Sequence, residues 1–150
     1  MTPTPTRLII IFLFFCTCMS NVSYAANKDY RSPEQVEGTI TTSLQEAKVL
    51  FDKGVVFIDV RNPRLYAKNH IPGAFHLDLK YAFNEAAVTA IAKKEQAIVI
   101  YCSGVKCSRS YHASEKAALW GFKKVHYFRG GIVEWKKAGS PMDFGSKTAY

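Results

Sequence analysis

The stretch that decides the fold is "AIVIYCSGVKCSRS", residues 97–110. It begins with a wholly apolar run, residues 97–102, of the kind that forms a strand buried on both faces of a sheet. A loop with one glycine follows, and "SYHASEKAALWGF", residues 110–122, then has the apolar spacing of a helix that stops at Gly121. An apolar strand that leads through a loop into a helix is typical of a parallel α/β sheet.

The same alternation of strands and helices continues on both sides of this stretch. "VVFIDV" (55–60) and "VHYF" (125–128) are further apolar strands, and "AFHLDL" (74–79) is a strand or extended segment. Helices are expected at residues 42–54, 62–70, 84–95 and 130–139. The pattern predicts one α/β domain of about 110 residues, a parallel sheet with helices on both faces.

The N-terminal residues 1–25 differ in kind from the rest of the chain. Arg7 precedes an uninterrupted apolar run over residues 8–15, and the small residues Ser23 and Ala25 stand two positions apart. This layout predicts a secretory signal peptide over residues 1–25, and therefore a periplasmic or secreted protein. Because the apolar core is shorter than the roughly 20 residues that span a bilayer, we expect no membrane span after cleavage. A retained membrane anchor is the alternative.

The remaining chain divides into an N-terminal arm, residues 26–37, and a single domain, residues 38–145. The formal net charge of +8 becomes +7 (19 − 12) when Arg7 is removed with the signal peptide. The basic residues are scattered and form no stripe interleaved with aromatic residues, so nucleic acid is not an expected partner. The excess positive charge favours small anions or an anionic membrane face, and we expect a monomer.

Two cysteines, Cys102 and Cys107, remain after removal of the signal peptide. Cys102 ends a predicted strand before a helix, so backbone N–H groups and the positive end of the helix dipole would favour its thiolate. Lys106 and Arg109 add positive charge nearby, and such surroundings lower a thiol pKa and create a nucleophile. A buried structural cysteine is the alternative. Two cysteines are too few for the usual zinc site.

The chain resembles the rhodanese family in three blocks and in their order. The blocks are "FIDVRNPRLYAKNHIPGAFHLDL" (57–79), the Cys102 loop and "AALWGFKKVHYFRGGIVEWKKAGSP" (117–141), which together cover roughly residues 38–141. The resemblance implies a five-stranded parallel sheet flanked by helices. It also implies a sulfurtransferase in which Cys102 takes a sulfane sulfur from a donor such as thiosulfate and passes it to cyanide or a thiol. No metal or organic cofactor is implied.

The resemblance further implies that the loop after Cys102 binds an anion through several backbone N–H donors. The residues expected in this loop are Ser103, Gly104, Val105, Lys106, Cys107, Ser108, Arg109 and Ser110. Asp59 and Arg61 match the first motif of the family, and we expect them to support the loop rather than to take part in the chemistry.

The loop departs from the usual family pattern in length and in its second cysteine. It is expected to run from Cys102 through Arg109, eight residues, where six are usual in the family. In the related dual-specificity phosphatases an arginine stands six positions after the cysteine, and here that position is Ser108, so phosphatase activity is disfavoured.

Cys107 has three interpretations. It is an inert loop thiol, a resolving thiol that closes a disulfide with Cys102, or one half of a permanent disulfide. A thiol–disulfide redox protein that uses both cysteines, and a non-catalytic binding module of the same fold, are therefore the alternatives to sulfur transfer.

Overall fold

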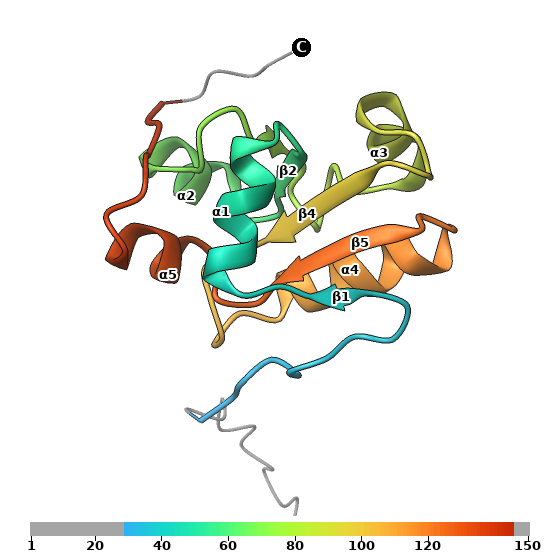
Figure 1. Cartoon of the computed structure of the whole chain (residues 1–150), viewed down its shortest axis with the longest axis horizontal. Helices are drawn as coiled ribbons and strands as arrows, with labels where there is room; N and C mark the ends of the chain where they lie inside the picture. Colours follow the sequence, from blue (N-terminus) through green and yellow to red (C-terminus); the bar gives the residue numbers. More distant parts are fainter. Residues whose placement is uncertain (1–28, 146–150) are drawn as a thin grey trace, which may run out of the picture.

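The computed structural model of the chain describes residues 29–145 (Figure 1). The predicted signal peptide, residues 1–25, and the start of the predicted arm lie outside the described residues. Five parallel strands form one sheet in the order β1-β5-β4-β2-β3, which confirms the predicted sheet. The strands are β1 (Ile40–Thr41), β2 (Val56–Asp59), β3 (Phe75–His76), β4 (Ala97–Tyr101) and β5 (Lys124–Phe128).

Helices follow the strands as the sequence pattern predicts. They are α1 (Leu44–Asp52), α2 (Pro63–Lys68), α3 (Glu85–Ile91), α4 (Arg109–Leu119) and α5 (Gly131–Lys137). Local side chains fix where they begin: Ser43 and Glu46 form a reciprocal capping box at α1, and Asn62 caps α2 by accepting from the Leu65 N–H. Each cap satisfies N–H groups that have no partner inside the helix.

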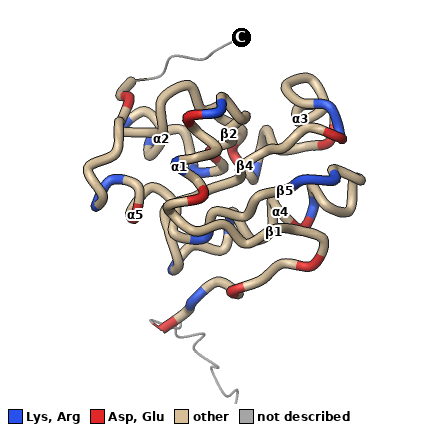
Figure 2. The backbone as a smooth tube through the Cα atoms, in the orientation of Figure 1, with Lys and Arg blue, Asp and Glu red and all other residues tan. Residues whose placement is uncertain are grey.

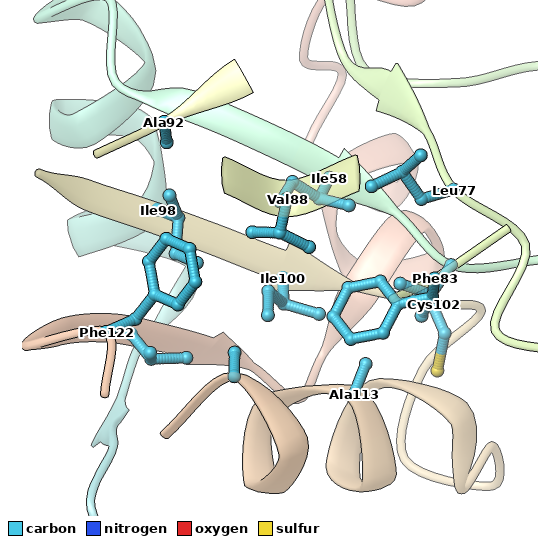
Figure 3. Packing of buried hydrophobic residues seen from close by; sticks show 13 residues of the cluster. Ile58, Leu77, Phe83, Val88, Ala92, Ile98, Ile100, Cys102, Ala113 and Phe122 are labelled. Atoms are coloured by element: carbon cyan, nitrogen blue, oxygen red, sulfur yellow. The ribbon is translucent and has the colours of Figure 1, made fainter. Parts of the chain in front are cut away.

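The central strand β4 divides the core into two parts, because successive side chains on a strand point to opposite faces. Ile98 and Ile100 pack with residues of α3 and α4, as Figure 3 shows. Val99 and Tyr101 pack on the other face with residues of α1 and α5, where the buried side chain of Trp135 is the largest. Both faces of the sheet are therefore covered, as a parallel sheet requires.

The sheet register brings three sequence motifs to one edge. Asp59 at the end of β2 pairs with Tyr101 of β4, and Tyr101 pairs with Phe128 of β5. The segments that follow these three residues therefore leave the sheet side by side, at the carboxyl ends of the strands. Ligands of open α/β sheets bind at this edge.

Lys, Arg, Asp and Glu residues are spread along the described chain, as Figure 2 shows. Within residues 29–145, no helix has the length and apolar character needed to cross a membrane. The same residues contain no group of three or more His, Cys, Asp or Glu side chains placed to hold a metal ion.

Candidate active site

The loop at the end of β4 is held in place by the glycine turn at the end of β5. Residues 102–108 connect β4 to α4. The Ile132 N–H donates to the Cys102 carbonyl at 3.0 Å, and the Val133 N–H donates to the Ser103 carbonyl at 3.1 Å. These two hydrogen bonds therefore join the start of the cysteine loop to the start of α5, although the two segments lie far apart in the sequence.

The loop ends one residue earlier than the sequence predicts. The His112 N–H donates to the Ser108 carbonyl at 3.1 Å, which closes the first turn of α4. Arg109 and Ser110 consequently belong to the helix, and the prediction that the loop extends through Arg109 is wrong. A helix boundary depends on such backbone hydrogen bonds, which a count of residues between motifs does not contain.

Gly131 permits the close approach of the two segments. Its φ of 55° is left-handed, and a Cβ placed on it would lie 2.3 Å from the Cys102 carbonyl oxygen. Only a glycine fits this contact without displacing the backbone of the cysteine loop.

Replacing Gly131 with alanine is expected to lower the free energy of unfolding by about 2–3 kcal/mol, because strain and a backbone clash act together. Gly139→Ala is the matched control: Gly139 has a φ of 66°, but nothing lies within 4 Å of a Cβ there. The control should lose only about 1 kcal/mol, from backbone strain alone. Urea unfolding measures both variants, and equal losses would contradict a clash at Gly131.

Cys102 is fully buried, with 0% of its surface exposed. Its Sγ lies 3.1 Å from the Ser110 Oγ and donates to the Cys107 carbonyl at 3.4 Å. Figure 3 shows its side chain in the core, beside Phe83. Burial raises the pKa of the Cys102 thiol, and the neighbouring Cys107 raises it further. Hydrogen bonds from the Ser110 hydroxyl and the Gly104 N–H oppose this shift without cancelling it.

Cys107 is half-buried and has the opposite shift. The side-chain interaction with Cys102 lowers the pKa of Cys107 to about 6, although burial opposes this. The N–H groups of Arg109 and Ser103 donate to the same sulfur, and the Arg109 charge adds to the effect. The prediction of a lowered pKa at Cys102 is therefore wrong. The physical reason is that the Arg109 charge and the N–H groups of Arg109 and Ser103 stabilise a charge on Cys107, while Cys102 lies in the apolar core.

A cavity of about 660 Å³ opens beside the loop. Its lining consists of residues 103–109 together with Gly130, Val133 and Glu134. The predicted loop residues Ser103 to Arg109 thus all border one space. Cys102 and Ser110 do not line it, and both are buried behind it.

Asp59 and Arg61 form a buried ion pair beneath this edge of the sheet. The Arg61 Nη2 lies 2.5 Å from the Asp59 Oδ2, and the side chains are only 3% and 0% exposed. The Arg61 backbone N–H also donates to Asp59, and the Nη2 donates to the Asn69 carbonyl. Neither side chain lines the cavity.

Asp78 is a site residue that the sequence reasoning missed. Its carboxylate lies 3.3 Å from the Arg109 guanidinium, which also donates to the Val60 carbonyl at 3.2 Å. These contacts tie the first turn of α4 to the end of β2. The signal that could have revealed Asp78 is its position at the end of the extended segment 74–79, at the same edge of the sheet.

The N-terminal arm supplies a second contact that the sequence did not reveal. The Ser32 N–H and hydroxyl both donate to the Val105 carbonyl, at 2.8 and 3.1 Å. The Arg129 guanidinium donates to the Ser32 carbonyl at 2.8 and 3.0 Å. The arm therefore supports the tip of the cysteine loop, and no local pattern indicates this pairing.

Comparisons with known proteins agree with this architecture. The chain is 33% identical over 124 residues to the tRNA uridine(34) hydroxylase of Buchnera aphidicola, an alignment covering 74% of this chain and 36% of that protein. The chain spans about a third of the length of the curated relatives it matches.

Solved structures share the fold. The BH2092 protein from Bacillus halodurans is 30% identical with a TM-score of 0.63, covering 72% of this chain and 80% of that one. Thiosulfate sulfurtransferase from Pseudomonas aeruginosa is 23% identical with a TM-score of 0.58, covering 72% of this chain and 21% of that one. Residues 43–138 match the Rhodanese-like domain family, and the chain belongs to that family.

Proposed function

We propose that the protein is a sulfurtransferase that moves a sulfane sulfur from an anionic donor such as thiosulfate to a thiol or cyanide acceptor. Cys102 carries the sulfur as a persulfide. The observation that carries this proposal is the cavity lined by the loop after Cys102, with Lys106 and Arg109 on its wall. Membership of the Rhodanese-like domain family supports it.

The surroundings of the cavity suit a small sulfur anion. Lys106 and Arg109 attract negative charge and outnumber Glu134, the acidic residue on the same wall. Cys107 lines the cavity whereas Cys102 is buried, so the proposal has the donor reach Cys102 past the Cys107 side chain.

The proposed reaction has two substitutions at sulfur. The Cys102 thiolate attacks the outer sulfur of thiosulfate, the S–S bond of the donor breaks, and sulfite leaves. The acceptor then attacks the outer sulfur of the persulfide, and the Cys102 thiolate leaves. The sulfane sulfur is transferred without an external oxidant or reductant, and the protein returns to its starting state.

The proposal covers sulfur transfer and no reaction on RNA. The curated relatives named for hydroxylation of tRNA uridine are about three times as long as the matched part, since the chain covers 36% of one and 32% of another. Figure 2 shows Lys and Arg at scattered positions along the described chain, a distribution that does not favour binding to a nucleic acid backbone.

Persulfide mapping tests the proposal. The reduced protein is incubated with thiosulfate, digested and analysed by mass spectrometry after persulfide trapping. We expect the peptide with Cys102 to gain the mass of one sulfur atom, and the added sulfur to disappear when cyanide is supplied. A protein that gains no sulfur from thiosulfate or polysulfide would contradict sulfur transfer and favour a binding module.

Thiol–disulfide exchange is the second candidate, because two free cysteines lie close together and the Cys102 thiol donates to the Cys107 carbonyl at 3.4 Å. The same experiment separates the two functions. A redox protein would lose both thiols to a Cys102–Cys107 disulfide on exposure to a mild oxidant and would gain no sulfur from thiosulfate.

A further inference from the structure

The tip of the cysteine loop is hydrogen-bonded to a segment that lies outside the cavity. The Val105 carbonyl accepts two hydrogen bonds from Ser32, one from its N–H at 2.8 Å and one from its hydroxyl at 3.1 Å. Val105 lines the cavity, whereas no residue in the described part of the arm, residues 29–37, does so. The arm therefore contacts the loop from outside the space that a donor would occupy.

Ser32 is itself held in place. It is only 2% exposed, and its carbonyl accepts two hydrogen bonds from the Arg129 guanidinium, at 2.8 and 3.0 Å. The next carbonyl, that of Pro33, accepts from the Tyr127 hydroxyl at 3.2 Å, and Tyr127 is fully buried. The contact with Val105 is therefore anchored to the end of β5.

This contact fixes the orientation of one peptide unit in the loop. Because a peptide unit is planar and trans, its carbonyl and its N–H point in opposite directions. The two donors on the Val105 carbonyl therefore also fix the direction of the Lys106 N–H, which points away from Ser32. Val105 and Lys106 both line the cavity, so the arm sets the position of a wall that a sulfur anion would meet.

We propose that Ser32 is a positioning residue for sulfur transfer: through the Val105 carbonyl it holds the loop tip in the conformation that binds the donor. The inference rests on the proposed function and adds a residue from outside the cavity to the same site. Ser32 precedes residues 43–138, the part of the chain that matches the Rhodanese-like domain family. The positioning is therefore supplied by the N-terminal arm of this chain rather than by the matched domain.

The place of the contact predicts which kinetic quantity changes when it is lost. Cys102 is buried, and its carbonyl accepts from the Ile132 N–H at 3.0 Å, so the reacting sulfur should keep its position without Ser32. The loop tip would lose its outer support, and the donor would bind more weakly. A loss of this kind raises the half-saturating donor concentration and leaves the maximal rate nearly unchanged.

Three variants test the role by the rate at which thiosulfate, at a series of concentrations, loads Cys102, followed by quenched-flow mass spectrometry. Ser32→Ala keeps the N–H donor, so the half-saturating concentration should rise only about twofold. Ser32→Pro has neither donor and should raise it at least about fivefold, with a maximal rate within about twofold of the wild type. Thr39→Ala is the matched control, because the Thr39 N–H and hydroxyl likewise donate to one carbonyl, that of Val36, rather than to the loop. It should load like the wild type.

A double-mutant cycle shows whether Ser32 acts through the loop tip. Lys106→Ala removes a cation from the cavity wall and should itself raise the half-saturating concentration. Combining it with Ser32→Pro should raise this concentration by less than the product of the two single effects, because both changes act on the same peptide segment. Effects that multiply would contradict a role through the tip.

Amide hydrogen exchange gives a readout that needs no sulfur transfer. The peptide covering residues 103–108 should exchange at least about threefold faster in Ser32→Pro than in the wild type, and at the wild-type rate in Thr39→Ala. Circular dichroism and thermal unfolding show whether Ser32→Pro is folded. If it is not, Arg129→Met replaces it, because this change removes both donors to the Ser32 carbonyl and should also raise the half-saturating concentration.

The outcomes separate this role from its rivals. An unchanged half-saturating concentration in Ser32→Pro overturns the inference and leaves sulfur transfer intact, since the arm then only stabilises the fold. An equal rise in Thr39→Ala also overturns it, because the contact with the loop would not be the cause. A wild-type protein that takes up no sulfur overturns the proposed function and this inference together.

Discussion

Replacing Cys102 with serine is expected to reduce the rate of sulfur transfer from thiosulfate to cyanide at least about a hundredfold. A serine hydroxyl is a far weaker nucleophile than a thiolate, and it forms no persulfide. The fold should survive, because the Ser110 Oγ and the Cys107 carbonyl offer hydrogen-bond partners to the new hydroxyl. The unfolding free energy should therefore change by only about 1 kcal/mol. Thiocyanate formation and thermal unfolding measure the two quantities.

Cys107→Ser is the comparison variant for this prediction. It keeps the sulfur that is proposed to carry the persulfide, so its loss of activity should be smaller than that of Cys102→Ser. The reverse order, with Cys102→Ser active and Cys107→Ser inactive, would show that Cys107 is the carrier. The lowered pKa of Cys107 and its place on the cavity make this comparison necessary.

The fold follows from the sequence to a large extent because its strongest signals are local. The apolar run in β4 and the cap residue Asn62 each determine a strand or a helix start within a few residues. The strand β1 was not found by pattern, because Ile40–Thr41 is a two-residue, exposed strand at the edge of the sheet. Its pairing with β5 depends on tertiary structure, which local periodicity does not record.

The site follows from the sequence only in part. The motifs place Cys102 at the end of a strand, and the structure puts it there. They assign the lowered pKa to the wrong thiol, because burial and the direction of N–H groups depend on the folded loop. The contact of Ser32 with Val105 joins residues 73 positions apart, and Asp78 reaches Arg109 across the sheet edge.

Replacing Asp59 with asparagine is expected to lower the free energy of unfolding by about 3–5 kcal/mol. The Arg61 guanidinium is 3% exposed, and it would keep its charge in the core without a counter-ion. Burial lowers the pKa of Arg61, but the hydrogen bond and the charge of Asp59 more than offset this, so the guanidinium stays protonated in the folded protein. The asparagine retains the side-chain shape and one acceptor oxygen, so the lost charge dominates the effect.

Glu85→Gln is the matched control, because it makes the same change in an ion pair of similar length on the surface. The Lys94 Nζ lies 2.6 Å from the Glu85 Oε1, but these side chains are 39% and 47% exposed. Water replaces the lost partner there, so the control should lose about 0.5 kcal/mol or less. Urea unfolding at constant m-value measures both variants. If Asp59→Asn lost no more than Glu85→Gln, the pair would not support the edge of the sheet that holds the cysteine loop. A loss confined to Asp59→Asn would instead show that this ion pair stabilises the sheet next to the cysteine loop. Asp59 pairs with Tyr101 on the neighbouring strand, and Cys102 follows Tyr101 directly.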